Sequence, residues 1–156
     1  MAQSGRMTDT SESLVRPGAI HHVRLTVTDI ARSKEFYVRL LGAVPAVDFS
    51  DQAGDPAVLA DPSRIYGGCV FSLGDQLLGL RPVAEAGDRF QSTRVGLDHL
   101  SLAVGTRDEL LAAVARLDAA GVDHGEVTEL TGFGIAILSV QDPDDINLEL
   151  TAPLSS

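Results

Sequence analysis

The sequence predicts an α+β fold of two tandem βαβββ modules, which form a cup-shaped mixed sheet with the helices outside. The first observation is an internal repeat: HHVRLTVTD, from His21 to Asp29, has the same pattern as DHLSLAVGT, from Asp98 to Thr106. The second is that a helical pattern and then two apolar strand patterns follow each copy. A tandem repeat of one module therefore accounts for most of the chain.

The first helix is predicted to begin after Asp29 and to end at Gly42. Aspartate is a preferred N-cap because its carboxylate accepts hydrogen bonds from free N–H groups of the first turn. Glycine is the usual residue after a helix because it adopts the left-handed conformation at little cost. The apolar residues between them recur at helical spacing: Ile30, Phe36, Tyr37, Leu40 and Leu41.

The second helix has a clearer start. Thr106 and Glu109 have the Thr-x-x-Glu spacing of a capping box, in which each side chain binds the backbone N–H of the other residue. Gly121 is placed to end this helix. The apolar stripe between these signals comprises Leu110, Val114 and Leu117.

The remaining strands come in two pairs, GGCVFSLG with QLLGLRP and FGIAILSV with INLELTAP. The segment from Phe49 to Arg64 is expected to be a loop, with an extra strand as one option, because it contains Gly54, Pro56 and Pro62. The predicted domain organisation is a flexible tail over 1–17 and a single domain over 18–153. Within that domain, module 1 covers about 18–83, the linker 84–95 and module 2 about 96–153.

Alternation along the strands predicts which side chains face the inside of the cup. Val23, Leu25 and Val27 share one apolar face, as do Leu100, Leu102 and Val104, and Leu148 and Leu150. The opposite faces carry His22, Arg24 and Thr26 from the first strand, His99 and Ser101 from its repeat, and Asn147, Glu149 and Thr151 from the last strand. Polar residues therefore collect on the concave surface.

Two histidines and a carboxylate among these residues form a candidate metal site: His22, His99 and Glu149. A set of two imidazoles and one carboxylate leaves coordination positions open for substrate and water, or for dioxygen. It suits Fe(II), Mn(II) or a similar divalent ion better than a closed structural zinc site. Each residue alone has an ordinary structural interpretation, and their equivalent places in the two modules favour the metal site.

Other inward-facing residues are candidates for substrate binding. Arg24 and Arg81 could hold a carboxylate or enolate of the substrate, or Arg81 could pair at the rim with an acid such as Asp75. The remaining polar candidates are Thr26, Ser101 and Asn147. The general base stays unassigned, with Tyr66 as one option.

Bulk properties narrow the partners to small molecules. A formal net charge of -10 disfavours nucleic acids and anionic membrane surfaces. Cys69 is the only cysteine, so no intrachain disulfide forms and a reducing cytoplasm is expected. Cys69 itself is interpreted as a core residue.

Three segments, GAIHHVRLTVTDIARSKEFYVRLLG, GLDHLSLAV and DPDDINLEL, resemble the vicinal-oxygen-chelate superfamily of glyoxalases, bleomycin-resistance proteins and extradiol dioxygenases over about 18–153. The resemblance implies that His22, His99 and Glu149 are metal ligands. Gly79 stands where a fourth ligand is common, which makes glyoxalase I and methylmalonyl-CoA epimerase activities less expected. Three ligands resemble instead the extradiol dioxygenases and the fosfomycin-resistance transferases. The transferases need a cationic pocket, and Lys34 is the only lysine.

Two functional hypotheses follow. The first is a divalent-metal-dependent enzyme of glyoxalase or dioxygenase type (dioxygenase, lyase or isomerase) that binds vicinal oxygens of a small substrate. The alternative is a bleomycin-resistance-like protein that sequesters a cationic antibiotic without catalysis. The resemblance also implies a homodimer, in which the modules lie side by side or are exchanged between chains. Exchange would build each site from two chains.

Overall fold

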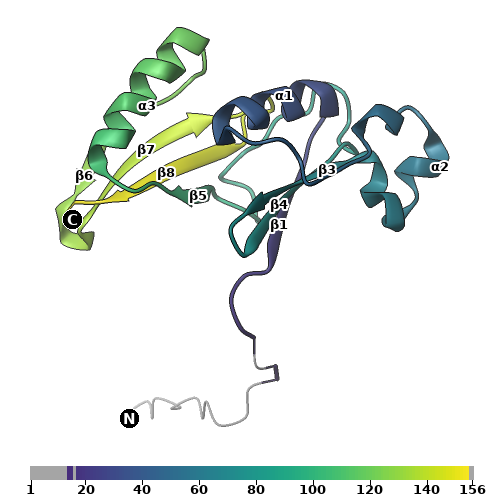
Figure 1. Cartoon of the computed structure of the whole chain (residues 1–156), viewed down its shortest axis with the longest axis horizontal. Helices are drawn as coiled ribbons and strands as arrows, with labels where there is room; N and C mark the ends of the chain where they lie inside the picture. Colours follow the sequence, from purple (N-terminus) through teal and green to yellow (C-terminus); the bar gives the residue numbers. More distant parts are fainter. Residues whose placement is uncertain (1–13, 16, 155–156) are drawn as a thin grey trace, which may run out of the picture.

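The computed structural model describes residues 14, 15 and 17–154 and consists of two four-stranded sheets with helices α1 and α3 on the same side of them (Figure 1). Apart from 14, 15 and 17, the predicted tail lies outside the described residues. Within these residues, no helix has the length and apolar character needed to cross a membrane.

The two sheets repeat the same topology. In module 1, the strand order is β1-β4-β3-β2, with β1 parallel to β4 and the other pairs antiparallel. In module 2, the order is β5-β8-β7-β6, with β5 parallel to β8. The elements of module 1 are β1 (His22–Thr26), α1 (Ile30–Leu41), β2 (Val47–Asp48), β3 (Cys69–Leu73) and β4 (Gln76–Arg81). Those of module 2 are β5 (Leu100–Ala103), α3 (Arg107–Ala120), β6 (Thr128–Leu130), β7 (Ile135–Gln141) and β8 (Asn147–Pro153). The predicted α+β fold of two βαβββ modules is confirmed, and the two sheets do not close into one.

Both helices begin and end where the sequence predicts. The Asp29 carboxylate accepts a hydrogen bond from the backbone N–H of Arg32, and Gly42 ends α1 with φ 63°. Thr106 and Glu109 form the complete capping box of α3, and Gly121 ends that helix with φ 64°. Each of these signals lies within three residues of the helix end that it marks.

The connection between β2 and β3 differs from the expected loop. The expected segment, Phe49 to Arg64, contains no strand, because the short strand β2 ends just before it. The segment instead folds largely into short helices. These are η1 (Ser50–Gln52), α2 (Pro56–Leu59) and η2 (Pro62–Gly67), while η3 (Thr131–Phe133) is the equivalent short helix of module 2. Asp55 and Asp61 each cap a helix whose first residue is proline, a combination that starts helices as readily as it marks turns.

The alternation of the strands is confirmed by burial. Leu25 and Val27 are buried, whereas His22, Arg24 and Thr26 are exposed on the other face of β1. The same holds in β8, where Leu148 and Leu150 are buried and Glu149 is partly exposed. One continuous hydrophobic core, which includes residues of both modules, lies against the helices.

Cys69 belongs to this core, as predicted. It is fully buried in β3, and burial raises the pKa of its thiol to about 12. A thiol with this pKa stays protonated near neutral pH, so Cys69 is no nucleophile.

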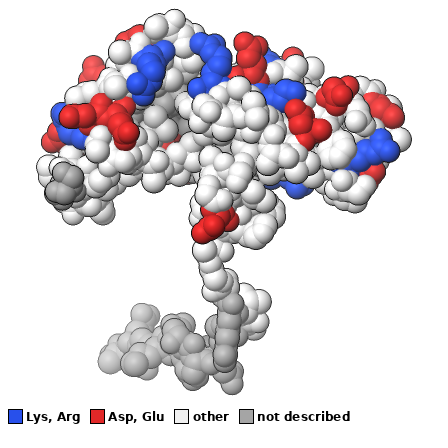
Figure 2. Space-filling model, in the orientation of Figure 1, with Lys and Arg blue, Asp and Glu red and all other residues white. Residues whose placement is uncertain are grey.

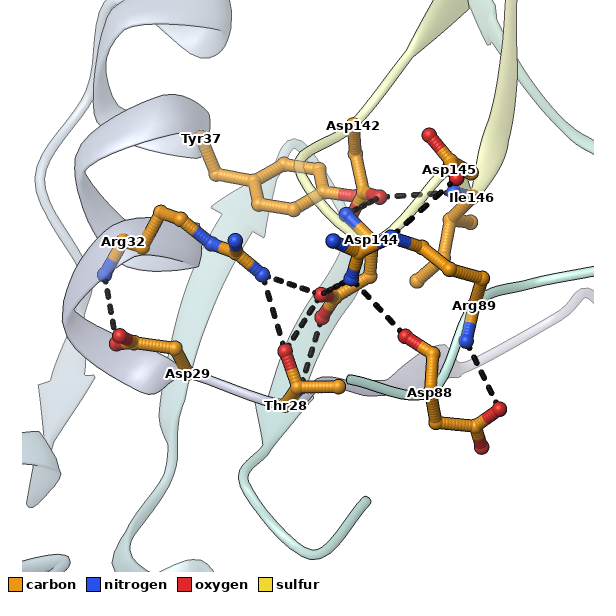
Figure 3. Close-up of polar contacts among 10 residues, drawn as sticks. All are labelled: Thr28, Asp29, Arg32, Tyr37, Asp88, Arg89, Asp142, Asp144, Asp145 and Ile146. Atoms are coloured by element: carbon orange, nitrogen blue, oxygen red, sulfur yellow. Dashed lines mark hydrogen bonds and ion pairs between the residues drawn. The ribbon is translucent and has the colours of Figure 1, made fainter. Parts of the chain in front are cut away.

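The turn between β7 and β8 joins the two modules, because its buried aspartates bind residues of module 1 (Figure 3). The Tyr37 hydroxyl donates a hydrogen bond to Asp142 Oδ2 over 3.1 Å. Asp144 Oδ2 accepts a hydrogen bond from the backbone N–H of Thr28 over 2.7 Å, and Asp144 Oδ1 lies 2.5 Å from a guanidinium nitrogen of Arg32. The sequence predicts the turn, but not its burial or its contacts with module 1.

Replacement of Tyr37 by phenylalanine should lower the free energy of unfolding by about 1.5–3 kcal/mol, because the buried Asp142 carboxylate loses a hydrogen bond. Burial is the main cause of the raised pKa of Asp142, so this carboxylate has little access to water as a substitute. Urea unfolding measures the change.

Tyr66→Phe is the matched control, since the Tyr66 hydroxyl makes no hydrogen bond within the described residues. Its effect should stay within about 0.5 kcal/mol. Equal effects of the two substitutions would show that the Tyr37 hydroxyl does not stabilise the junction.

Candidate metal and substrate site

His99 and Glu149 lie side by side on the inner face of module 2. His99 immediately precedes β5, and Glu149 is in β8 opposite Ser101, in the parallel pair that β5 and β8 form. The distance between His99 Nε2 and Glu149 Oε1 is 3.8 Å. This is too long for a hydrogen bond. It is close to the separation of about 3–3.5 Å expected for neighbouring ligand atoms that each lie about 2.1 Å from one ion.

Asp98 orients the His99 ring. Its Oδ1 lies 2.5 Å from His99 Nδ1. A carboxylate at this position favours the tautomer with its proton on Nδ1, which leaves the lone pair on Nε2, the ring nitrogen 3.8 Å from Glu149 Oε1. Asp98 is not among the residues predicted from the sequence, although its position next to His99 in the chain was a usable signal.

Hydroxyl groups orient Glu149. Thr151 Oγ1 donates a hydrogen bond to Glu149 Oε1 over 3.0 Å, and Ser101 Oγ lies 2.6 Å from Thr151 Oγ1. Two predicted substrate-binding residues are thus already engaged, Ser101 in this network and Asn147 through a hydrogen bond that Gln141 donates to its side-chain oxygen over 3.1 Å.

His22 does not join this pair within one chain. It lies in β1, at the edge of the other sheet, with its Nδ1 3.0 Å from Nδ1 of His21. Among residues 14, 15 and 17–154, no three or more histidine, cysteine or acidic side chains are grouped closely enough to hold a metal ion. The side chains of one chain therefore fit two of the three predicted ligand positions.

Arg24 and Arg81 meet over the ring of Tyr66. The guanidinium carbon of Arg81 lies 3.8 Å from the ring centroid, and that of Arg24 lies 5.8 Å from it. Neither arginine forms an ion pair with an acidic side chain within the described residues, so the alternative pairing of Arg81 with Asp75 is not found there. Two of the predicted substrate-binding residues are therefore adjacent cations.

Thr26 occupies the same face as these arginines, opposite Arg81 in the parallel pair of β1 and β4. Arg24 and Thr26 both line a hollow of about 340 Å³ beside the linker. A larger hollow of about 580 Å³ lies between α1 and α3, and none of the predicted site residues lines it. The predicted site residues therefore lie on the inner faces and not in the hollow between the helices.

The charges on the face seen in Figure 2 are mixed, with acidic and basic side chains interspersed over the helices. The acidic net charge is thus not concentrated in one patch on this face. An interspersed surface is the ordinary arrangement for a globular domain.

Comparisons with known proteins agree with this fold. The family model of the Glyoxalase/Bleomycin resistance protein/Dioxygenase superfamily matches residues 19–150. No protein with a curated description matches the chain.

Several solved structures are similar. A glyoxylase/bleomycin resistance protein/dioxygenase domain from Frankia sp. EAN1pec has a TM-score of 0.66 and 26% identity, over 91% of this chain and 96% of that one. A lactoylglutathione lyase from Agrobacterium tumefaciens has a TM-score of 0.61 and 17% identity, over 87% and 94%. A fosfomycin resistance protein from Listeria monocytogenes has a TM-score of 0.63 and 14% identity, over 88% and 94%. The last two show similarity of fold alone. Given the match of the family model over most of its length, the chain belongs to the Glyoxalase/Bleomycin resistance protein/Dioxygenase superfamily.

Proposed function

We propose that this protein is a divalent-metal-dependent enzyme of glyoxalase or dioxygenase type that acts on a small substrate with vicinal oxygens. The observation that carries the proposal is the pair of His99 and Glu149, whose facing atoms are 3.8 Å apart. The contact of Asp98 with the other ring nitrogen of His99 supports it, because metal-bound histidines commonly have such a carboxylate partner.

The third ligand in this proposal is His22 of a second copy of the chain. Within one chain, β1 and β5 are both edge strands, so each sheet has an open edge next to a candidate ligand. Open edges are available for pairing with another chain. A homodimer with exchanged modules brings the β1 edge of one copy to the β5 edge of the other, and each site then has three ligands.

A bound divalent ion, Fe(II), Mn(II) or similar, would act as a Lewis acid for two neighbouring substrate oxygens. The protein's own contribution is to hold the ligands in position and to orient the substrate. Arg24, Thr26 and Arg81 are the proposed substrate contacts on module 1, with Ser101 and Asn147 on module 2. The proposed setting is a reducing cytoplasm, in keeping with the single cysteine.

The first test is the metal content of the protein after anaerobic reconstitution with Fe(II), Mn(II) or Zn(II), followed by removal of free metal and elemental analysis. Wild type should retain close to one ion per chain, and His99→Ala and Glu149→Ala should lose most of it, because each removes one of three ligands. Glu126→Ala is the matched control, since this exposed carboxylate lies outside the site.

Circular dichroism must show that each variant is folded. A folded wild type that retains none of the three metals would make the metalloenzyme proposal wrong and favour the antibiotic-sequestering alternative. Equal metal content in Glu149→Ala and Glu126→Ala would also contradict the proposal.

A further inference from the structure

We propose that Arg24, Arg81 and Tyr66 form a binding site for the carboxylate group of a small organic acid. The inference rests on the proposed function only in taking this acid to be the substrate. The binding site itself is argued from module 1 alone.

Within the described residues, the guanidinium groups of Arg24 and Arg81 have no acidic partner. Within the described residues, Arg32, Arg64, Arg89 and Arg107 form ion pairs with acidic side chains, whereas Arg39, Arg94 and Arg116 also have none. Arg24 and Arg81 differ from these three in that they share the ring of Tyr66. The chain has 22 acidic residues against 12 lysines and arginines, yet within the described residues none of these acids pairs with Arg24 or Arg81. In addition, Arg81 Nε is buried without a hydrogen-bond partner. A buried N–H without a partner is costly, so the protein itself does not fully satisfy this guanidinium group.

The backbone at Tyr66 has an unusual conformation. Ile65 and Tyr66 have φ values of 46° and 59°, in the left-handed region that residues with side chains rarely adopt. This conformation accompanies the position of the Tyr66 ring against Arg81, 3.8 Å from the guanidinium carbon. Such strain is commonly found at ligand sites. The negative ring face also reduces the repulsion between the two cations.

Gly79 stands where the family resemblance implies that a fourth metal ligand is common. Arg24 lies opposite Gly79 in the β1–β4 pair, and a Cβ atom at Gly79 would lie 3.4 Å from the Arg24 side chain. This is an ordinary van der Waals distance, so the Arg24 side chain lies directly beside Gly79 on the face where a longer residue at position 79 would project. The cationic side chain of Arg24 thus lies beside the position where a fourth metal ligand is common, and a cation there suits an anionic substrate.

A hollow lies next to Arg24. Arg24 and Thr26 line the hollow of about 340 Å³, whereas Arg81 and Tyr66 do not. Its volume is within the usual range of about 300–1,000 Å³ for small-molecule sites, so it can hold the part of the acid that extends beyond Arg24. Arginine binds carboxylate through two parallel hydrogen bonds. Guanidinium groups bind carboxylate and phosphate alike. The net charge of -10 repels a phosphate dianion more strongly than a monoanionic carboxylate, which favours the carboxylate.

The test uses the full chain treated with a chelator, so that metal binding plays no part in it. Isothermal titration calorimetry compares pyruvate, its neutral counterpart pyruvamide and inorganic phosphate as probes. Pyruvate should bind, and pyruvamide and phosphate should bind at least about 10-fold more weakly. Arg24→Gln and Arg81→Gln should each weaken pyruvate binding about 10-fold or more, whereas Arg116→Gln on α3 should leave it unchanged.

A second readout identifies the location. The chain has no tryptophan and only two tyrosines, and Tyr37 is fully buried, so a change in tyrosine emission on addition of pyruvate reports on Tyr66. Tyr66→Phe removes this reporter and should abolish the emission change.

Each alternative result overturns the inference. Tighter binding of phosphate than of pyruvate would exclude a carboxylate site, and pyruvate binding that Arg24→Gln and Arg81→Gln leave intact would place it elsewhere. Absence of pyruvate binding to folded wild type would also exclude a carboxylate site. Because metal retention is measured separately, loss of the metal site and loss of the carboxylate site are distinguishable.

Discussion

A mixture of His22→Ala and Glu149→Ala chains should regain about a quarter of the wild-type metal content, although each variant alone should bind metal more than about 100-fold more weakly. The expectation follows from a site with His22 of one copy and His99 and Glu149 of the other. In a mixed dimer, one site then receives all three ligands and the other site receives only one. If half of the dimers are mixed, about one site in four is intact.

The measurement is elemental analysis of a mixture that has been unfolded and refolded together, which allows the chains to redistribute. The matched control is a mixture of His99→Ala and Glu149→Ala chains. Both substitutions lie in module 2, so every site in a mixed dimer still lacks one ligand. Equal metal content in the two mixtures would contradict the exchange of modules.

The two mixtures differ because the three proposed ligands lie on two separate sheets of one chain. In one chain, His99 and Glu149 are neighbours across β5 and β8, whereas His22 lies on a separate sheet. A metal site within one chain would need the two sheets to move together, and no mixture of two defective chains would then restore it. Dilution offers an independent check, because metal affinity of an exchanged dimer falls when the chains separate.

Most of the fold could be predicted because its signals are local. The capping residues Asp29 and Thr106 and the terminal glycines Gly42 and Gly121 act over a few positions, and the structure confirms them. Alternation along each strand likewise determines which face is buried. That is why His99 and Glu149 could be assigned to one inner face, and the structure brings them together.

The relative placement of the two sheets could not be predicted in this way. It depends on contacts between residues more than 100 positions apart, such as Tyr37 with Asp142, and the Asp142 to Asp145 segment has the composition of an ordinary turn. The contact between Arg81 and the Tyr66 ring could not be predicted from the sequence either. It requires a left-handed conformation at Ile65 and Tyr66, which their residue types disfavour.

Asp144→Asn should be the most damaging single substitution at the junction of the modules, lowering the free energy of unfolding by about 2–3 kcal/mol. The Asp144 side chain is only 5% exposed, and it is 2.5 Å from Arg32 and 3.5 Å from Arg89. It also accepts hydrogen bonds from the backbone N–H and the hydroxyl of Thr28. Asparagine keeps the shape but loses the charge and presents N–H groups toward the arginines. Because both arginines are nearly half exposed, the loss should stay below that of a fully buried ion pair.

Asp145→Asn provides the matched control, because it makes the same chemical change one residue further along the same turn. The Asp145 side chain is 59% exposed, and its backbone has φ 63°, a conformation that asparagine accepts readily. Its effect in urea unfolding should therefore be within about 0.5 kcal/mol. A large loss confined to Asp144→Asn would mean that the buried carboxylate holds the modules of one chain together. Equal small losses would mean that the apolar core joins them without it, since that core includes residues of both modules.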